Sequence, residues 1–337
     1  MTCNSSNIHY VRLEVMKTIE AQVGGFIDKF LMPIEKIWQP SDLLPDTNAE
    51  DFIEQFHEIR EQSKELCYDF WVTLVGDTVT EEALPTYESW LMDVQGINQV
   101  DEAESPWVSW VRKWTAEENR HGDVLNKFLY LSGRVNMREV EVTTQYLISD
   151  GFDIGTDRDP YKNFVYTSFQ ELATNISHKR VGELAKQKGN DLLSKICKIV
   201  AGDEMRHYLA YREFVKTIFQ YDPSEMMLAY YDMMKKKIVM PAHLIRESGE
   251  EIASAYVEFS NSALRLGVYT PRDYIDILRK LNKYWDIEHI TDLSGPAEKA
   301  RDYLMALPAR LERVTDRIKV SDYQREFKWV SPNGMMK

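Results

Sequence analysis

The chain has 337 residues, of which 44% are hydrophobic and 28% charged, so a sizeable core is feasible and wholesale disorder is excluded. Lys and Arg number 41 against 54 Asp and Glu, which gives a formal charge of −13. This balance argues against a nucleic-acid or anionic-membrane binder, since both need a dominant basic surface. Cys3, Cys67 and Cys197 are too scattered for a disulfide scaffold or a zinc-finger array. No apolar run approaches the ~20 residues of a membrane span.

Helix breakers are few, 15 glycines and 12 prolines, which favours long helices. Helical patterns cover, in chain order, residues 11–31, 51–145 with short breaks, 161–221, 226–240 and 250–320. Pro- and Asp-containing loops lie at 38–46 and 151–160, and residues 327–330 are predicted to form a short strand or hairpin. The sequence predicts one all-α domain over 1–337: an N-terminal arm and helix (1–50), a bundle core (51–221), and flanking C-terminal helices with a tail (222–337).

The spacing Glu-x-x-His occurs three times in this chain and places a carboxylate and an imidazole on one helix face. In the first case, Glu54 and His57 lie opposite the apolar side of their helix. This pair is predicted to be solvent-exposed and to bind no metal.

The other two pairs lie in the middle of apolar stripes. Glu118 and His121 share a stripe with Trp107, Val111, Trp114, Leu125 and Leu129, and Glu204 and His207 share one with Leu193, Cys197, Val200, Tyr211, Val215 and Ile218. A buried carboxylate must be paired, protonated or metal-bound. For either motif alone, a Glu–Arg pair with Arg120 or Arg206 would serve equally well, but two identical constellations favour a metal site.

A two-metal carboxylate bundle needs one further glutamate from each of two other helices. Glu171 lies on an inward stripe and precedes Glu204 by 33 residues, while Glu81 precedes Glu118 by 37. Glu82 is adjacent to Glu81, and Pro85 favours Glu81 because it removes the helical bond to the carbonyl of that residue. Four carboxylates and two imidazoles suit iron or manganese better than zinc or calcium.

At these residues the chain resembles the soluble acyl-[acyl-carrier-protein] desaturases, ferritin-like di-iron enzymes of plant plastids and some bacteria. The resemblance extends from Trp38 to Trp329, and its most specific stretches are Glu117-Glu118-Asn119-Arg120-His121-Gly122-Asp123 and Asp203-Glu204-Met205-Arg206-His207. It implies a ferritin-like four-helix bundle with additional flanking helices. It also implies that two iron ions are bound by Glu81, Glu118, His121, Glu171, Glu204 and His207.

The resemblance further implies an O2-dependent desaturase that introduces a cis double bond, Δ9 by default, into an acyl chain on acyl carrier protein. Ferredoxin would supply electrons, and a homodimer is expected. Thr174 is the catalytic candidate: its hydroxyl can face the reacting oxygen or bond back to its own helix. Asp203 and Trp38 are candidates for orienting a ligand histidine.

Several positions depart from the pattern of the family. Trp90, Asp93 and Asn163 stand where smaller or neutral residues would line the distal end of the acyl pocket, which favours a shorter chain such as palmitoyl. Because both expected partners are acidic, docking must use local basic patches. The clearest candidate is the run Lys235, Lys236 and Lys237 with Arg246 nearby.

Other functions stay open at this stage. The alternatives are another di-iron oxidase or oxygenase acting on acyl chains, a ferroxidase or iron-storage protein, and an inactive paralogue that only binds. Residues Met1 to Ile8 show no signal or transit character. The expected compartment is therefore the cytoplasm, with the plastid stroma as the alternative for a processed chain.

Overall fold

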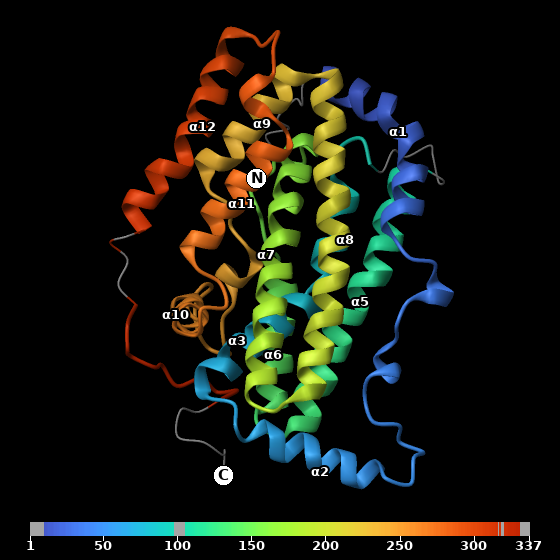
Figure 1. The fold of residues 1–337 in the computed structure, drawn as a ribbon, viewed down its shortest axis with the longest axis vertical. Coiled ribbons are helices and arrows are strands. Elements are labelled where there is room, and N and C mark those ends of the chain that lie inside the picture. The colour runs from blue at the N-terminus through green and yellow to red at the C-terminus, as the bar shows by residue number, and fades with distance from the viewer. Residues whose placement is uncertain (1–9, 98–104, 316, 318–319, 331–337) are drawn as a thin grey trace.

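The computed structural model describes residues 10–97, 105–315, 317 and 320–330, so Met1 to Ile8, used above for the compartment, lie outside it. Within these ranges the chain forms α-helices and short 3-10 turns and no strand, which confirms the all-α prediction (Figure 1). The helices are α1 (Tyr10–Phe30), α2 (Phe52–Ser63), α3 (Tyr68–Glu82), α4 (Leu84–Asp93), α5 (Pro106–Ser132), α6 (Met137–Asp150), α7 (Pro160–Gln187), α8 (Asp191–Tyr221), α9 (Pro223–Lys236), α10 (Tyr256–Leu266), α11 (Pro271–Tyr284) and α12 (Gly295–Thr315), with 3-10 turns η1 (Ile34–Lys36), η2 (Pro40–Asp42), η3 (Pro241–Leu244) and η4 (Ile287–His289).

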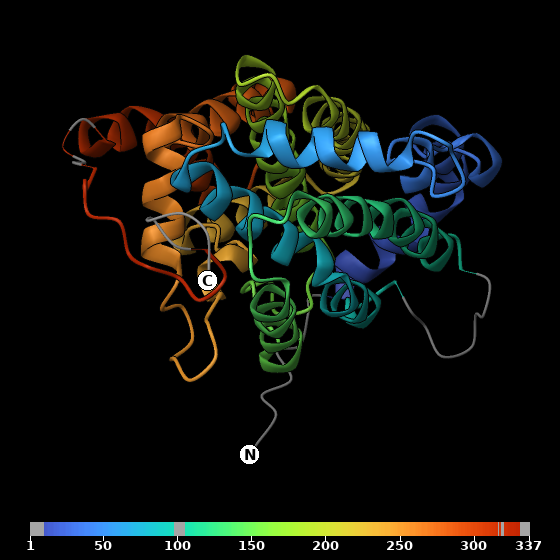
Figure 2. The same ribbon diagram turned by 90° about the horizontal axis from the view of Figure 1, so that it is seen from below.

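Four helices form the bundle that carries the predicted ligands. Helix α7 packs along α8, α3 packs against α5, and α5 also contacts α8. Figure 1 shows α5, α7 and α8 side by side along the long axis, with α1 beside α5 and α9 to α12 on the opposite flank. Seen from below in Figure 2, α2 lies across the end of the bundle.

The ends of these helices follow from local sequence. Ser105 caps α5 by accepting from the amide of Trp107, and Gly133 ends it with a left-handed φ of 61°. Asp159 caps α7 in the same way, through the amides of Tyr161 and Lys162. The break predicted at Pro85 is present, because α3 ends at Glu82 and α4 starts at Leu84.

Two sequence predictions differ from the structure. Helix α9 ends at Lys236 rather than Met240, because Lys237 has a φ of 68° and the residue before Pro241 is extended. Residues 327–330, predicted to form a short strand or hairpin, form no strand. The segment is a turn closed by the amide of Phe327 and the carbonyl of Val330, and it buries Trp329.

The bundle core is divided in two by polar residues. Along α5, the buried apolar positions before Glu118 belong to one hydrophobic cluster and those after His121 to another. The same division occurs on α8 on either side of Glu204 and His207. The polar layer between two dry clusters is therefore the candidate site. No helix in the described ranges is long and apolar enough to cross a membrane.

Candidate metal centre

The structure brings the six predicted ligand residues together. They form two overlapping groups whose ligand atoms lie within 4.8 Å of one another: Glu81, Glu118, His121 and Glu204, and Glu118, Glu171, Glu204 and His207. Helix α3 supplies Glu81, α5 supplies Glu118 and His121, α7 supplies Glu171, and α8 supplies Glu204 and His207. By contrast, Glu54 and His57 on α2 are exposed, as predicted.

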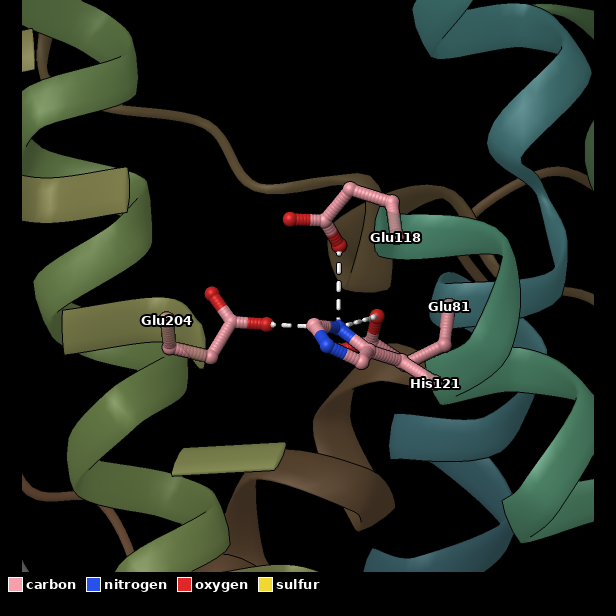
Figure 3. A group of neighbouring side chains, drawn as sticks. All are labelled: Glu81, Glu118, His121 and Glu204. Atoms are coloured by element: carbon pink, nitrogen blue, oxygen red, sulfur yellow. Dashed lines mark ion pairs between the residues drawn. The ribbon is translucent and has the colours of Figure 1, made fainter. Parts of the chain in front are cut away.

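Each imidazole directs its Nδ1 atom toward the carboxylates. The Nδ1 atom of His121 lies 3.1 Å from Glu118, 3.2 Å from Glu204 and 3.7 Å from Glu81 (Figure 3). On the other side, the Nδ1 atom of His207 lies 2.6 Å from Glu118 and 3.6 Å from Glu171. Glu118 and Glu204 belong to both groups and occupy the middle of the cluster.

Asp203 and Trp38, the predicted orienting residues, lie behind His121. The Nε2 atom of His121 is 3.2 Å from Asp203 Oδ2, and the indole of Trp38 donates to the same oxygen at 2.9 Å. Arg120 and Arg206 also donate to Asp203, at 2.8 and 2.6 Å. These contacts fix which nitrogen of His121 faces the cluster.

Glu117 does the same for His207, and the sequence analysis missed it. Its Oε2 atom lies 3.0 Å from His207 Nε2 and accepts from Arg206 at 2.6 Å, while the Met32 amide donates to Oε1 at 2.6 Å. A signal for it existed, because an acid directly precedes the central glutamate in both motifs. The pairing is crosswise: Glu117 on α5 contacts His207 on α8, and Asp203 on α8 contacts His121 on α5.

Glu81 also has an outer partner that the sequence analysis did not assign. The Nε2 atom of His178, on α7, lies 2.9 Å from Glu81 Oε1, and His178 is buried. No comparable hydrogen bond to Glu171 is found among the described residues, since its Oε1 atom has no partner. The two groups are therefore not equivalent.

The donor atoms of the cluster fit a metal better than they fit one another. Within the cluster, four buried atoms make no hydrogen bond of normal geometry to any described residue: Glu118 Oε1, His121 Nδ1, Glu171 Oε1 and His207 Nδ1. Native proteins rarely leave buried polar atoms unpaired. Carboxylate and imidazole donors gathered around common points are a ligand set for iron or manganese.

The charges indicate the same need for a cation. Burial raises the pKa of Glu171 well above its ordinary value, and the neighbouring Glu204 and Glu118 carboxylates add to the rise. Burial alone would lower the pKa of His121 and His207, but the Glu118 carboxylate raises both well above the ordinary value. Without metal, bound protons thus supply the positive charge that the cluster requires.

Thr174 lies at the edge of the cluster. Its hydroxyl is 2.6 Å from Glu204 Oε2 and also 3.1 and 3.2 Å from the carbonyls of Glu171 and Gln170. The hydroxyl therefore bonds back to its own helix and also contacts a candidate ligand carboxylate, and its single proton is shared among three acceptors. Its facing the reacting oxygen stays a prediction.

A cavity of about 160 Å³ opens beside the cluster, and Glu81, Glu118, Glu204 and Thr174 form part of its wall. The rest comes mainly from α3, α7, η3 and α10, with contributions from the first turn of α4, from α5 and from the residue Tyr269: Thr73, Asp77, Thr80, Leu84, Tyr87, Trp114, Gln170, Ala173, Ser177, Met240, Pro241, Ala242, His243, Tyr256, Phe259, Ser260, Ala263 and Tyr269. The wall is largely apolar, as a site for a hydrocarbon chain requires. Sequence reasoning missed the contribution of α10.

The three predicted pocket residues do not line this cavity. Asp93 is at the surface and pairs with Arg158 at 2.6 Å, and Trp90 packs edge-on against Tyr166. Asn163 is fully buried, and its amide has no partner among the described residues. The break at Ala83 starts a new helix, so Trp90 and Asp93 do not continue the face of α3.

Two of the four predicted docking cations, Lys236 and Arg246, form ion pairs within the described part of the chain. Lys236 pairs with Asp157 at 3.0 Å, Arg246 pairs with Asp150, and Lys235 lies over the ring of Tyr231. Lys237 follows the end of α9.

A four-helix bundle with a buried centre of four glutamates and two histidines defines a class of dinuclear metal proteins. A family model described as "Fatty acid desaturase" matches residues 11–331, and the chain belongs to this family. It is 46% identical over 324 residues to "Stearoyl-[acyl-carrier-protein] 9-desaturase 1, chloroplastic" of Arabidopsis thaliana, covering 95% of this chain and 82% of that protein.

Other relatives differ in their named reaction. "Palmitoyl-[acyl-carrier-protein] 4-desaturase 3, chloroplastic" of Ophrys sphegodes is 46% identical over 330 residues, covering 96% of this chain and 82% of that protein. The X-ray structure of DesA2 from Mycobacterium tuberculosis has a TM-score of 0.51 at 17% identity, covering 87% of this chain and 99% of that chain. At this identity the match supports the fold alone.

The metal-free protein is expected to lose stability in acid partly through Glu117. Burial would raise its pKa, but hydrogen bonds from His207 and Arg206 lower it from 4.5 to about 2. A carboxyl with a depressed folded pKa stabilises the fold above its unfolded pKa and loses that contribution as pH falls toward the folded value. Glu117→Gln should therefore cost on the order of 2–3 kcal/mol at neutral pH.

This cost should shrink between about pH 5 and pH 2, as measured by urea unfolding of the apo protein across that range. Glu61→Gln is the control, because Glu61 and its partner Lys64 are both exposed and such pairs contribute about 0–1 kcal/mol. A constant Glu117→Gln difference at every pH would contradict the prediction.

His178 is expected to set the affinity of one metal position only. The His178→Gln variant keeps an amide nitrogen near the position of Nε2, so it can still donate to Glu81. The shorter side chain of His178→Asn places its amide nitrogen out of reach of Glu81. His178→Asn should weaken one step of a cobalt titration about 10–100-fold and leave the other unchanged. His178→Gln should recover most of the loss. Equal effects of both variants, or equal weakening of both steps, would assign His178 a packing role instead.

Proposed function

We propose that the chain is an acyl-[acyl-carrier-protein] desaturase that holds two iron ions and introduces a cis double bond, Δ9 by default. The observation that carries the proposal is the convergence of six ligand residues, five of them buried and Glu81 partly buried, beside a largely apolar cavity. The named activities of relatives 46% identical support the acyl-carrier substrate. The preference for a palmitoyl chain loses its basis, because the three residues behind it lie outside the cavity.

Glu81, Glu118, His121, Glu171, Glu204 and His207 would hold the irons. When bound, iron supplies the O2 chemistry needed to break unactivated C–H bonds, which no side-chain acid or base can do. For each double bond, one O2, two electrons from the donor and two protons yield two waters, and the acyl chain gives up two hydrogens.

The side chains have separate tasks in this reaction. Asp203 and Glu117 hold the two imidazoles with Nδ1 facing the cluster. The Thr174 hydroxyl holds a proton 2.6 Å from Glu204 Oε2, at the cavity wall. Apolar wall residues such as Phe259, Met240 and Ala263 bind the hydrocarbon and exclude water.

A ferredoxin-type protein is the proposed electron donor, and the active form is proposed to be a homodimer. Because the proposed substrate is attached to a freestanding acyl carrier protein, this enzyme is proposed to work where such carriers occur, in the cytoplasm or the plastid stroma. The word chloroplastic in the names of several relatives favours the stroma for those proteins.

To test the proposal, the iron-loaded protein is incubated with reduced ferredoxin, O2 and an acyl carrier protein bearing a C14, C16 or C18 chain. We expect a monounsaturated product by gas chromatography, one O2 consumed per double bond and about two irons per chain. Iron uptake without an O2-dependent product would favour the storage alternative. A folded protein that takes up no iron would rule out the metal centre.

A further inference from the structure

A row of cations lies where the end of α11 approaches α8. The guanidinium of Arg212 is 3.8 Å from the ring of Tyr284 and 5.1 Å from that of Tyr208. Lys216 lies 4.9 Å over Tyr284, and Lys280 lies 5.2 Å over Tyr208. Three cations and two tyrosine rings therefore alternate in one line, which we call the cationic row. It joins two helices that Figure 1 shows as separate elements of the fold.

No described carboxylate forms an ion pair with Arg212, Lys216 or Lys280. The nearest acid in the chain, Glu213, instead accepts from the hydroxyl of Tyr284. This differs from the predicted docking cations Lys236 and Arg246, which pair with Asp157 and Asp150. In a chain of charge −13, three neighbouring cations without an ion pair to any described residue form a local positive surface.

The row also carries unmet hydrogen-bonding capacity and like-charge repulsion. The hydroxyl of Tyr208 and the Nε atom of Arg212 are buried and have no partner among the described residues. Tyr208 is fully buried. Burial lowers the pKa of Lys280, and the charge of Arg212 lowers it further. An anion placed against the exposed cations of the row would relieve this repulsion.

We propose that the cationic row is the docking surface for the small acidic protein that donates electrons, an inference that rests on the proposed function. A single phosphate is too short for the row, because the row extends over two rings and, from Tyr208 to Lys216, about two turns of α8. The carboxylates of a protein surface can instead meet all three cations.

The position of the row favours the donor over the acyl carrier. No residue of the row lines the cavity, so the acyl chain of the carrier can occupy the cavity while the row stays free. Tyr208, the innermost member, directly follows the candidate ligand His207 on α8. Each docked donor gives up one electron. Two such electrons, with two from the acyl C–H bonds, reduce one O2 to two waters.

The test reverses charge at the two exposed lysines, in the variant Lys216→Glu with Lys280→Glu. The matched control is Lys195→Glu with Lys198→Glu, which makes the same charge change at exposed positions of the same helix α8. Binding of oxidised plant-type ferredoxin is measured by calorimetry at low salt. Steady-state turnover is measured with the iron-loaded enzyme.

We expect the row variant to bind ferredoxin at least about 10-fold more weakly and to raise its KM by a similar factor. The KM for the acyl carrier should stay within about twofold, and the control should match the unaltered protein. Added salt should abolish the difference, because exposed charges are screened. A single turnover of chemically reduced enzyme should be unchanged.

Other outcomes would overturn the proposal. A rise in KM for the acyl carrier alone would assign the row to the carrier, and dissociation of a dimer would assign it to contact between copies. Equal ferredoxin binding by the row variant and the control would also refute it. Failure of the chemically reduced, unaltered enzyme to form product would instead refute the proposed function. Calorimetry would still decide the role of the row.

Discussion

Glu118→Ala is expected to abolish metal binding at both positions and to bring desaturation below detection. Glu118 contributes a ligand atom to both groups of the cluster and lies 3.1 and 2.6 Å from the two imidazoles. Removing a shared ligand leaves each position short of donors, and iron bound there carries the whole of the C–H chemistry. Metal content per chain, measured after iron loading, should fall from about two to near zero.

Comparison with single-group ligands makes this prediction specific. Glu81→Ala and Glu171→Ala each remove a residue from only one group, so each should retain about one metal. Glu54→Ala is the control, because Glu54 has the same Glu-x-x-His spacing but is exposed on α2. If Glu118→Ala retained as much metal as Glu81→Ala, Glu118 would not be shared between the two positions.

Helical periodicity explains why the ligands could be predicted from sequence. The sequence of an amphipathic helix shows which face is buried. A glutamate and a histidine three residues apart in the middle of that apolar face can therefore be recognised as buried candidate ligands. The stripes around Glu118 and Glu204 are buried as predicted. The choice of Glu81 over Glu82 rests mainly on the family resemblance, with support from Pro85, whose helix break the structure confirms.

Which ligand each outer residue contacts could not be predicted from helical periodicity, because it depends on how helices face one another. Glu117 lies about 100° round α5 from Glu118 and finds His207 only because α8 passes on that side. His178 lay on a predicted inward stripe, but its partner Glu81 is on α3. Single-helix patterns contain no information on such crosswise pairs.

The cavity was missed for a related reason. Helix α10 packs on α3 at Gly76, where any Cβ atom would collide with the ring of Phe259. This close approach allows Phe259 and Ala263 to form part of the wall. The two helices are far apart in sequence, and the periodicity of each is satisfied whatever it packs against. Pocket residues were sought too far along α4, at Trp90 and Asp93, whereas only its first turn, with Leu84 and Tyr87, reaches the cavity.

Asp203→Asn is expected to weaken metal binding and the fold together. One oxygen of Asp203 meets His121, Trp38 and Arg120, and the other meets Arg206. Asparagine retains an acceptor but not the charge. Loss of the outer carboxylate should reduce metal affinity about 10–100-fold. Leaving the buried guanidinium of Arg120 with less compensation should cost about 3–5 kcal/mol of unfolding free energy.

Asp123→Asn is the matched control for this variant. Asp123 lies in the same stretch of α5 and pairs with Lys127 at 2.7 Å, but both side chains are largely exposed. Such pairs contribute about 0–1 kcal/mol. Urea unfolding of metal-free protein and a cobalt titration should separate the two variants. An Asp203→Asn protein with unaltered metal affinity would contradict an orienting role.

The double variant of Asp203→Asn with Glu117→Gln tests whether the two outer acids act as one network. Arg206 donates to both, at 2.6 Å each, and Arg120 pairs with Asp203 and lies 3.9 Å from Glu117. Removing the second acid leaves both guanidinium groups uncompensated, which neither single change does. The combined loss should therefore exceed the sum of the single losses by about 0.5–3 kcal/mol. Simple additivity would mean that the two imidazoles are held independently.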